Sequence, residues 1–233
     1  GVELGDIINN ANVDIVNNPS ITAGDNGVNF TGVVTSSSVN VSGNNHGIHA
    51  DDHGIYFGDN ISGGSDVTIN GNIIDANLNN DAVGSGIFFD GTVKNATVTI
   101  GNGGYTQGSS SNIIRVGDNN GAGGVSELDG IHFDKEVGQG AKIVIDANRI
   151  GYRANGNVGQ SVSQRPVADD GIEFGGDITG NADIKIADNW IRAKDDGVQF
   201  SGEVRDFTNI LIGGLDGFNN DQNFIRGGDN GIS

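Results

Sequence analysis

Aspartates placed directly before glycine are the residues of this chain whose type and spacing could do chemistry. Asp129, Asp170 and Asp196 each precede a Gly-Ile or Gly-Val pair, so they occupy one position of a recurring motif. Three further carboxylates occupy the preceding position: Asp169 and Asp195 lie directly before Asp170 and Asp196, and Asp229 lies before Asn230-Gly231. Carboxylates stacked about 5 Å apart would repel one another by roughly 1 kcal/mol per pair in water. We therefore expect something to relieve this repulsion.

Two arrangements could do so. The six aspartates could bind calcium, which prefers several oxygen ligands, or their side chains could splay outward into solvent. A separate interpretation is that each side chain accepts hydrogen bonds from nearby backbone amides, which would make the residue a turn former. The sequence leaves these interpretations open, and calcium is the cofactor that it suggests.

A second set of residues occupies the third position of the same motif. Tyr56, Phe88, His132 and Glu173 follow one another there in successive copies, and they form a candidate ligand-binding face. Aromatic faces beside polar groups suit sugar rings. The alternative is that neighbouring loops cover the rings and bury them in a satellite core.

A third set, within one short segment, could bind a transition metal, because histidine and aspartate are dense there. It comprises His46, His49, Asp51, Asp52 and His53. However, the segment 47–50 aligns with 190–193, so His49 could equally be an ordinary outward residue of a strand.

The motif that places these side chains is Gly-Ile/Val-x-Phe/Leu. Its copies begin at Gly1, Gly27, Gly54, Gly86, Gly130, Gly171, Gly197 and Gly231, at intervals of 26, 27, 32, 44, 41, 26 and 34 residues. A nearly constant minimum interval with variable additions is typical of a solenoid whose coils carry loops of different length.

Two more columns complete each unit. One is an alternating apolar triplet such as Val67-Thr68-Ile69, and the other is an asparagine followed by a strand with a central isoleucine. The asparagines are Asn18, Asn45, Asn72, Asn112, Asn148, Asn189 and Asn223, and we expect their amides to bond the backbone and one another at an inward turn. Period-two alternation of β-branched residues indicates strands. The sequence thus predicts one all-β domain over 1–233, a right-handed parallel β-helix of about seven coils with three short strands each.

Composition limits the partners. Twelve basic and thirty acidic residues give a net charge of −18, which argues against nucleic acid and favours cations or glycans. No apolar run is long enough to span a bilayer, so we expect no membrane insertion. Cysteine is absent. The chain has no methionine at position 1, and its ends fall inside a repeat, so we expect a fragment or processed unit of a longer repeat protein.

The order Val-x-Ile, Asn-x-Ile, Asp-Asp-Gly-Ile/Val-x-Phe resembles the β-helix repeat of the pectate-lyase-like superfamily over essentially the whole chain. Segments 212–217 and 223–226 also resemble repeats of large bacterial extracellular proteins. If the chain is an enzyme, the resemblance implies a polysaccharide lyase or hydrolase with Asp170, Asp196, Glu173 and Arg192 in its catalytic set. The Asn-Thr-Asp, Gly-His-Gly and Arg-Ile-Lys segments of polygalacturonase-type hydrolases are not present.

These features lead to three functional hypotheses. The first is a non-catalytic structural or adhesive module, extracellular or on a bacterial cell surface, self-assembling through its coil ends or stabilised by calcium. The second is the lyase or hydrolase acting on an extracellular polysaccharide. The third is a glycan-binding module that uses the aromatic face without turnover.

Overall fold

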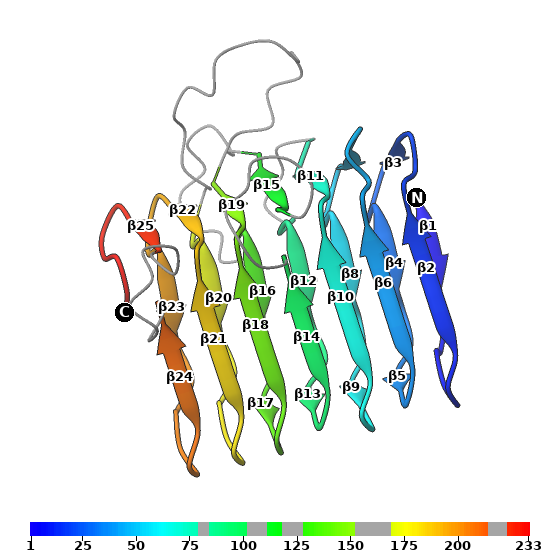
Figure 1. Ribbon diagram of the computed structural model, residues 1–233. Coiled ribbons are helices and arrows are strands. Elements are labelled where there is room, and N and C mark those ends of the chain that lie inside the picture. Colours follow the sequence, from blue (N-terminus) through cyan, green and yellow to red (C-terminus); the bar gives the residue numbers. More distant parts are fainter. Residues whose placement is uncertain (79–83, 102–110, 118–127, 152–168, 214–222) are drawn as a thin grey trace.

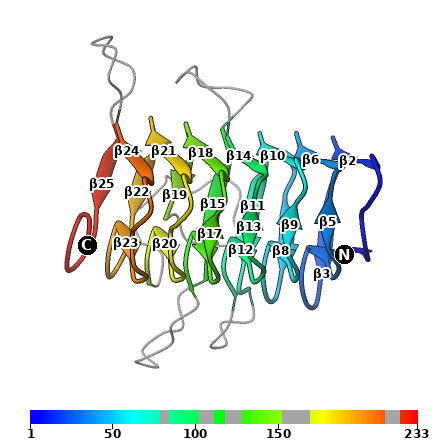
Figure 2. The ribbon, with the colours of Figure 1, turned by 90° about the horizontal axis from the view of Figure 1, so that it is seen from below.

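The fold is a right-handed coil of parallel strands. The computed structural model describes residues 1–78, 84–101, 111–117, 128–151, 169–213 and 223–233. In this part of the chain seven coils stack along one axis, with the two termini at opposite ends of the stack (Figure 1). Seen from below, the strands of each sheet follow one another along that axis (Figure 2). The predicted fold class is confirmed.

Three seven-stranded sheets form the sides of the coil. The first contains β1 (Val2–Leu4), β4 (Val28–Phe30), β8 (Ile55–Phe57), β12 (Ile87–Phe89), β16 (Ile131–Phe133), β20 (Ile172–Phe174) and β23 (Val198–Phe200). The second contains β2 (Asn12–Val16), β6 (Ser38–Ser42), β10 (Asp66–Asn70), β14 (Thr97–Ile100), β18 (Lys142–Asp146), β21 (Asp183–Ala187) and β24 (Asn209–Ile212). The third contains β3 (Ile21–Ala23), β7 (Ile48–Ala50), β11 (Ile73–Ala76), β15 (Ile113–Val116), β19 (Arg149–Ile150), β22 (Trp190–Arg192) and β25 (Phe224–Arg226).

A fourth, smaller sheet was not foreseen. It contains β5 (Val34–Thr35), β9 (Ile61–Ser62), β13 (Val93–Lys94) and β17 (Val137–Gly138). Isolated bridges extend its column to Ile7 at one end and, through Ile178, to Val204 at the other. Each coil contributes only one apolar side chain to this column, which is too short a pattern to read as a strand in the sequence.

Identical side chains stack in register inside the coil. The motif phenylalanines pair strand to strand, and Phe133 lies between Phe89 at 4.4 Å and Phe174 at 4.9 Å, with the three rings nearly parallel. Each of these three rings is about 1 % exposed. Because successive residues of a strand point to opposite faces, the phenylalanine column points inward and the neighbouring third-position column of the motif points outward.

The glycine of the motif is required by close packing. A Cβ on Gly130 would overlap the Cγ2 atom of Ile150 and would lie 2.5 Å from the carbonyl oxygen of Gly171. The same clash recurs at Gly54, Gly86 and Gly171. Because the first and third sheets meet at this corner without room for a side chain, the glycine recurs in every coil.

The asparagine column forms the predicted internal ladder, with one correction. Asn72 donates its amide to Asn112 Oδ1 (3.1 Å) and to the carbonyl of Val41 (2.8 Å). In the second coil the ladder residue is Asn44, which donates to Asn72 Oδ1 at 2.9 Å, whereas the predicted Asn45 is exposed. That coil places its ladder asparagine four residues before Ile48, the first residue of β7, instead of two as in Asn72-Ile73-Ile74, so the spacing did not identify which of the two adjacent asparagines belongs to the ladder.

Candidate functional site

The aspartates before glycine form a ladder that runs along the axis. Oδ1 of Asp129 accepts the backbone N–H of Asp170 (2.9 Å), and Oδ1 of Asp170 accepts that of Asp196 (2.7 Å). Oδ1 of Asp196 accepts the backbone and side-chain N–H groups of Asn230, both at 2.9 Å. One oxygen of each carboxylate therefore joins neighbouring coils.

Other residue types occupy the same position in the earlier coils and make the same bond. Asn26 Oδ1 accepts the N–H of His53 (3.2 Å), and His53 Nδ1 accepts the N–H of Ser85 (2.9 Å). Ser85 Oγ in turn accepts the N–H of Asp129 (3.3 Å). Each of these side chains thus accepts a backbone N–H, as the turn interpretation of the column requires. The side chain does not have to be charged to make this bond.

The second oxygen of Asp129 joins a different group, on the outer side of the first sheet. His132 Nδ1 lies 2.7 Å from Asp129 Oδ2 and 3.2 Å from Glu173 Oε2. Its other ring nitrogen, Nε2, lies 3.7 Å from Asp134 Oδ1. Asp129 is fully buried and His132 is 4 % exposed. Neighbouring strands β16 and β20 therefore bring a histidine between two carboxylates, an arrangement that we call the acid–histidine cluster (Asp129, His132 and Glu173).

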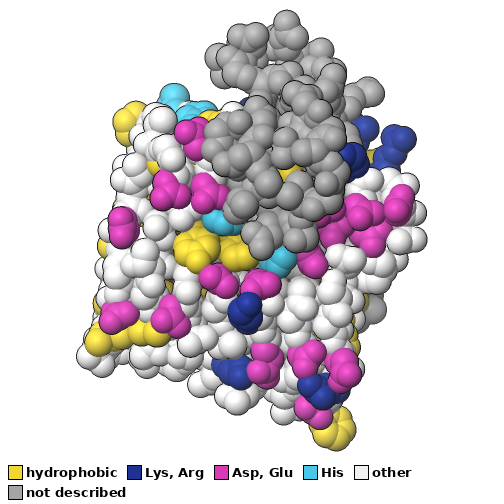
Figure 3. Space-filling model, turned by 180° about the vertical axis from the view of Figure 1, so that it is seen from behind, with side chains coloured by type: hydrophobic (Ala, Val, Ile, Leu, Met, Phe, Trp, Pro, Cys, Tyr) yellow, Lys and Arg dark blue, Asp and Glu magenta, His cyan; other side chains and the backbone are white. Residues whose placement is uncertain are grey.

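Gln199 connects this cluster to Asp170. In the amide orientation that satisfies both neighbours, its nitrogen donates to Glu173 Oε1 (3.2 Å) and to Asp170 Oδ2 (2.5 Å). Ser201 Oγ also donates to Glu173 Oε1 at 3.1 Å. On the face seen from behind, acidic and histidine side chains flank a group of hydrophobic ones (Figure 3). The third-position column of the motif thus converges with the aspartate column.

Burial shifts the carboxyl groups toward their protonated forms. It raises the pKa of Asp170 from 3.8 to about 7, and the charges of Asp129, Asp169 and Glu173 add to the rise, although the Asp196 N–H opposes it. Burial, with Asp129 and Asp195, raises the pKa of Asp169 to about 6. The pKa of Glu173 is also raised, first by burial and then by Asp129. Acidic groups that hold protons near neutral pH are the kind found at catalytic and binding sites.

The two histidines of this face shift in opposite directions. Burial would lower the pKa of His132, but the hydrogen bond and charge of Asp129 outweigh it and raise that pKa above its ordinary value. Burial lowers the pKa of His53 to about 4, and the nearby His132 adds to the fall. His53 is therefore neutral at physiological pH, as its Nδ1 acceptor role requires, while His132 is held toward its cationic form.

The aromatic residues of the predicted ligand-binding face stack but are largely covered. Phe88 lies 5.8 Å from Tyr56 and 4.9 Å from His132, measured between ring centroids. His53 packs against Phe88 at 4.6 Å. Phe88 is only 6 % exposed, and the half-buried Tyr56 donates its hydroxyl to Asp90 at 2.8 Å. The rings therefore form a satellite core, and ligand binding by Tyr56, Phe88, His132 and Glu173 stays a prediction.

Arg192, the cation of the predicted catalytic set, lies apart. It is on β22 of the third sheet, where its register partner is Arg226. Among the described residues it forms no ion pair, and no side-chain hydrogen bond joins it to Asp170 or Asp196. The catalytic set is thus assembled only in part: Asp170 and Glu173 share Gln199, and Asp196 follows Asp170 in the ladder.

Within the described residues, two groups of side chains could hold a cation. Asp129, His132 and Glu173 place one ligand atom each within 4.8 Å of one another, as do Asp169, Asp170 and Asp195. The second, all-oxygen group matches the preference of calcium, whereas a nitrogen ligand favours a transition ion. Asp196 and Asp229 belong to neither group within the described ranges. Calcium binding itself stays a prediction.

The histidine-rich segment does not gather into one site. His49 faces outward from β7, with Nδ1 3.1 Å from Asp75 Oδ2. His53 belongs to the turn column instead, and His46 is exposed. The alternative stated for His49, an ordinary outward strand residue, describes its position.

Sequence reasoning missed two features of the structure. The turn column includes Asn26, His53, Ser85 and Asn230, which could have been found as the residues that precede glycine in the other copies of the motif. On the third sheet, Asp75 lies 3.4 Å from Arg115 Nε and beside His49. Nothing in the spacing marks Asp75 as buried.

Fold and site together define a right-handed parallel β-helix with an acidic, histidine-containing cluster on the outer side of its first sheet. Comparison of the chain with family models, with curated proteins and with solved structures finds no match. No helix in the described part of the chain is long and apolar enough to cross a membrane.

Proposed function

We propose that the chain is a non-catalytic structural or adhesive module, extracellular or on a bacterial cell surface. Its partners in this proposal are surface or matrix polysaccharides, or further copies of the chain stacked on its coils. We also propose that the chain is related to the pectate-lyase-like superfamily and to repeats of large bacterial extracellular proteins. The order of strands and turns in each coil supports this relationship.

The observation that carries this proposal is the interchangeability of the turn column. Asn26, Ser85 and Asn230 fill the position of Asp129 and Asp170 in other coils, and the side chains of Asn26 and Ser85 accept the same backbone bond. Amide, hydroxyl, imidazole and carboxylate groups all fill this position in different coils, so the requirement that the coils share is a hydrogen-bond acceptor for the next coil and not an acid. Among the described residues Arg192 lies on the third sheet without an ion pair to these acids, which adds support, because a lyase of the implied type places its arginine beside them.

Affinity electrophoresis through gels that contain neutral or acidic polysaccharides tests the proposal. At least one polysaccharide should retard the protein, and the recovered polymer should keep its original length. Shortening of the polymer would contradict the non-catalytic assignment. Failure of every polysaccharide to retard the protein would contradict the adhesive one.

A polysaccharide lyase or hydrolase is the second candidate, and the raised pKa values favour it. Asp170, with a pKa of about 7, could donate a proton near neutral pH, while a neighbouring ionised carboxylate accepts one. Under this alternative Asp170→Asn and Glu173→Gln should each abolish turnover. If the wild-type protein turns over none of the tested polysaccharides, the enzyme alternative is excluded for those substrates.

A further inference from the structure

In the last coils, the outer side of the third sheet carries arginine and aromatic side chains. Arg149, Trp190 and Phe224 occupy one register position on β19, β22 and β25. The Arg149 guanidinium lies 5.5 Å from the centre of the Trp190 ring, and Phe224 meets that ring edge-on at 5.4 Å. Two residues further along the same strands, Arg192 lies beside Arg226. We call these five residues the arginine–tryptophan surface.

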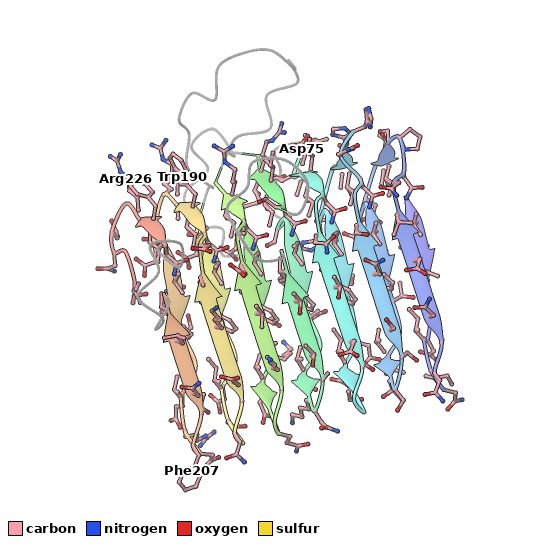
Figure 4. The ribbon with its side chains drawn as sticks, in the orientation of Figure 1. Asp75, Trp190, Phe207 and Arg226 are labelled. Carbon is pink, nitrogen blue, oxygen red and sulfur yellow. The ribbon has the colours of Figure 1, made fainter. Side chains whose placement is uncertain are left out.

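This surface is accessible. Phe224 is 54 % exposed, Arg226 is exposed, and Arg149, Trp190 and Arg192 are half-buried. Figure 4 shows Trp190 and Arg226 projecting outward from the same edge of the coil. Basic side chains also gather at the upper edge of the face seen from behind (Figure 3). The surface is thus available to a ligand outside the coil.

Two of its arginines, Arg192 and Arg226, carry charges that no described carboxylate pairs with. In the middle coils the same outward column neutralises itself, because Asp75 lies between His49 (3.1 Å) and Arg115 (3.4 Å). In the described part of the chain, by contrast, neither Arg192 nor Arg226 forms an ion pair with a carboxylate. Two adjacent guanidinium groups repel by roughly 1 kcal/mol in water, and an anion between them would replace that repulsion with attraction.

The combination of side chains selects the kind of anion. Guanidinium groups bind carboxylates in a bidentate manner, and exposed aromatic rings pack against the apolar faces of sugars. A polymer of uronic acids offers both, with one carboxylate on each sugar. Nucleic acid is a poorer fit, since its denser charge would meet the strong repulsion of a chain with net charge −18.

We propose that the arginine–tryptophan surface, built from Arg149, Trp190, Arg192, Phe224 and Arg226, binds acidic polysaccharide of the polyuronate type. The inference rests on the proposed adhesive function and specifies which surface performs it. Arg192 is then a ligand-binding residue of the third sheet and not a partner of the aspartates on the first.

Binding of polygalacturonate, with dextran as the neutral comparison, tests this assignment. The measurements are made in chelator, which removes calcium as a possible bridge between the polymer and the acidic turns. The double variant Arg192→Gln/Arg226→Gln should lose on the order of tenfold in affinity, and Trp190→Ala should weaken binding of the same polymer. Added salt should weaken wild-type binding, because exposed ion pairs are screened.

Arg205→Gln is the matched control, because Arg205 is an exposed arginine that already pairs with Asp177 and Glu203. It should bind polygalacturonate as the wild type does. Equal affinity of the double variant and this control would overturn the inference, as would tighter binding of duplex DNA than of polygalacturonate. Binding of dextran alone would overturn it and leave the adhesive function standing, whereas binding of no polysaccharide at all would remove both.

Discussion

The side chain of Asp170 accepts the backbone N–H of Asp196 through one oxygen and faces Gln199 through the other. The same carboxyl group is therefore part of the scaffold on one side and is joined through Gln199 to the acid–histidine cluster on the other. Asparagine could make the first contact equally well, as Asn26 does in its own coil. Substitution by asparagine thus separates the two roles.

The unfolding free energy should depend on the protonation of Asp170. Its pKa is raised from 3.8 to about 7, so the folded chain keeps this proton to a higher pH than the unfolded chain. Its contribution to stability is therefore fully present below the unfolded pKa of 3.8, and it is lost as the pH rises from there through the folded pKa of about 7. Asp170→Asn should make the decline shallower, by less than about 1.4 kcal/mol per pH unit, the limit for one proton.

Urea unfolding of wild type and Asp170→Asn across this pH range makes the measurement. The comparison between variants matters because His53, with its pKa lowered to about 4, destabilises the folded chain as pH falls below 6.5. Asp66→Asn, at an exposed position of β10, is the control and should keep the wild-type slope. A slope in Asp170→Asn identical to that of wild type would show that this carboxyl group does not hold its proton.

Loss of one ladder asparagine should be costly. Asn72→Ala removes the amide that bonds Val41 and Asn112 and leaves buried partners without hydrogen bonds, at about 1–3 kcal/mol each. Asn45→Ala, one coil away and exposed, should change stability by less than about 0.5 kcal/mol. Equal unfolding midpoints for the two variants in urea would contradict the ladder assignment.

Calcium should raise the thermal unfolding temperature if the group Asp169, Asp170 and Asp195 holds it, because a ligand that binds only the folded state stabilises that state. Chelator should reverse the shift, and Asp169→Asn/Asp195→Asn should abolish it. The Asp66→Asn control should respond as wild type does. A calcium shift that survives in the double variant would place the ion elsewhere.

The columns of the coil were predictable because each one repeats a strict requirement. Glycine recurs where a Cβ would overlap Ile150, and phenylalanine recurs where rings stack in register. The residue of the ladder in the second coil was missed, because Asn44 and Asn45 are adjacent and only the path of the turn decides which one points inward.

The sequence predicted which columns form the candidate site, but it did not predict how deeply their side chains are buried. The sequence indicated that Phe88 and His132 would share a face, yet their burial depends on what packs over that face in this fold. The raised pKa of Asp170 follows first from the burial of its own carboxyl group, which the spacing of the motif does not indicate. Arg192 lies on a strand of the third sheet although it is only four residues from Asp196 in sequence, so closeness in sequence does not place it in the site.

The most direct test of the account is an assay for product. Wild type and Asp170→Asn are incubated with neutral and acidic polysaccharides between about pH 4 and 9, with calcium or with chelator, and reducing ends and unsaturated sugars are measured. A non-catalytic module predicts no product above the protein-free blank under any condition. Product formation by wild type that disappears in Asp170→Asn would contradict the account and make the acid–histidine cluster, with Asp170, an active site.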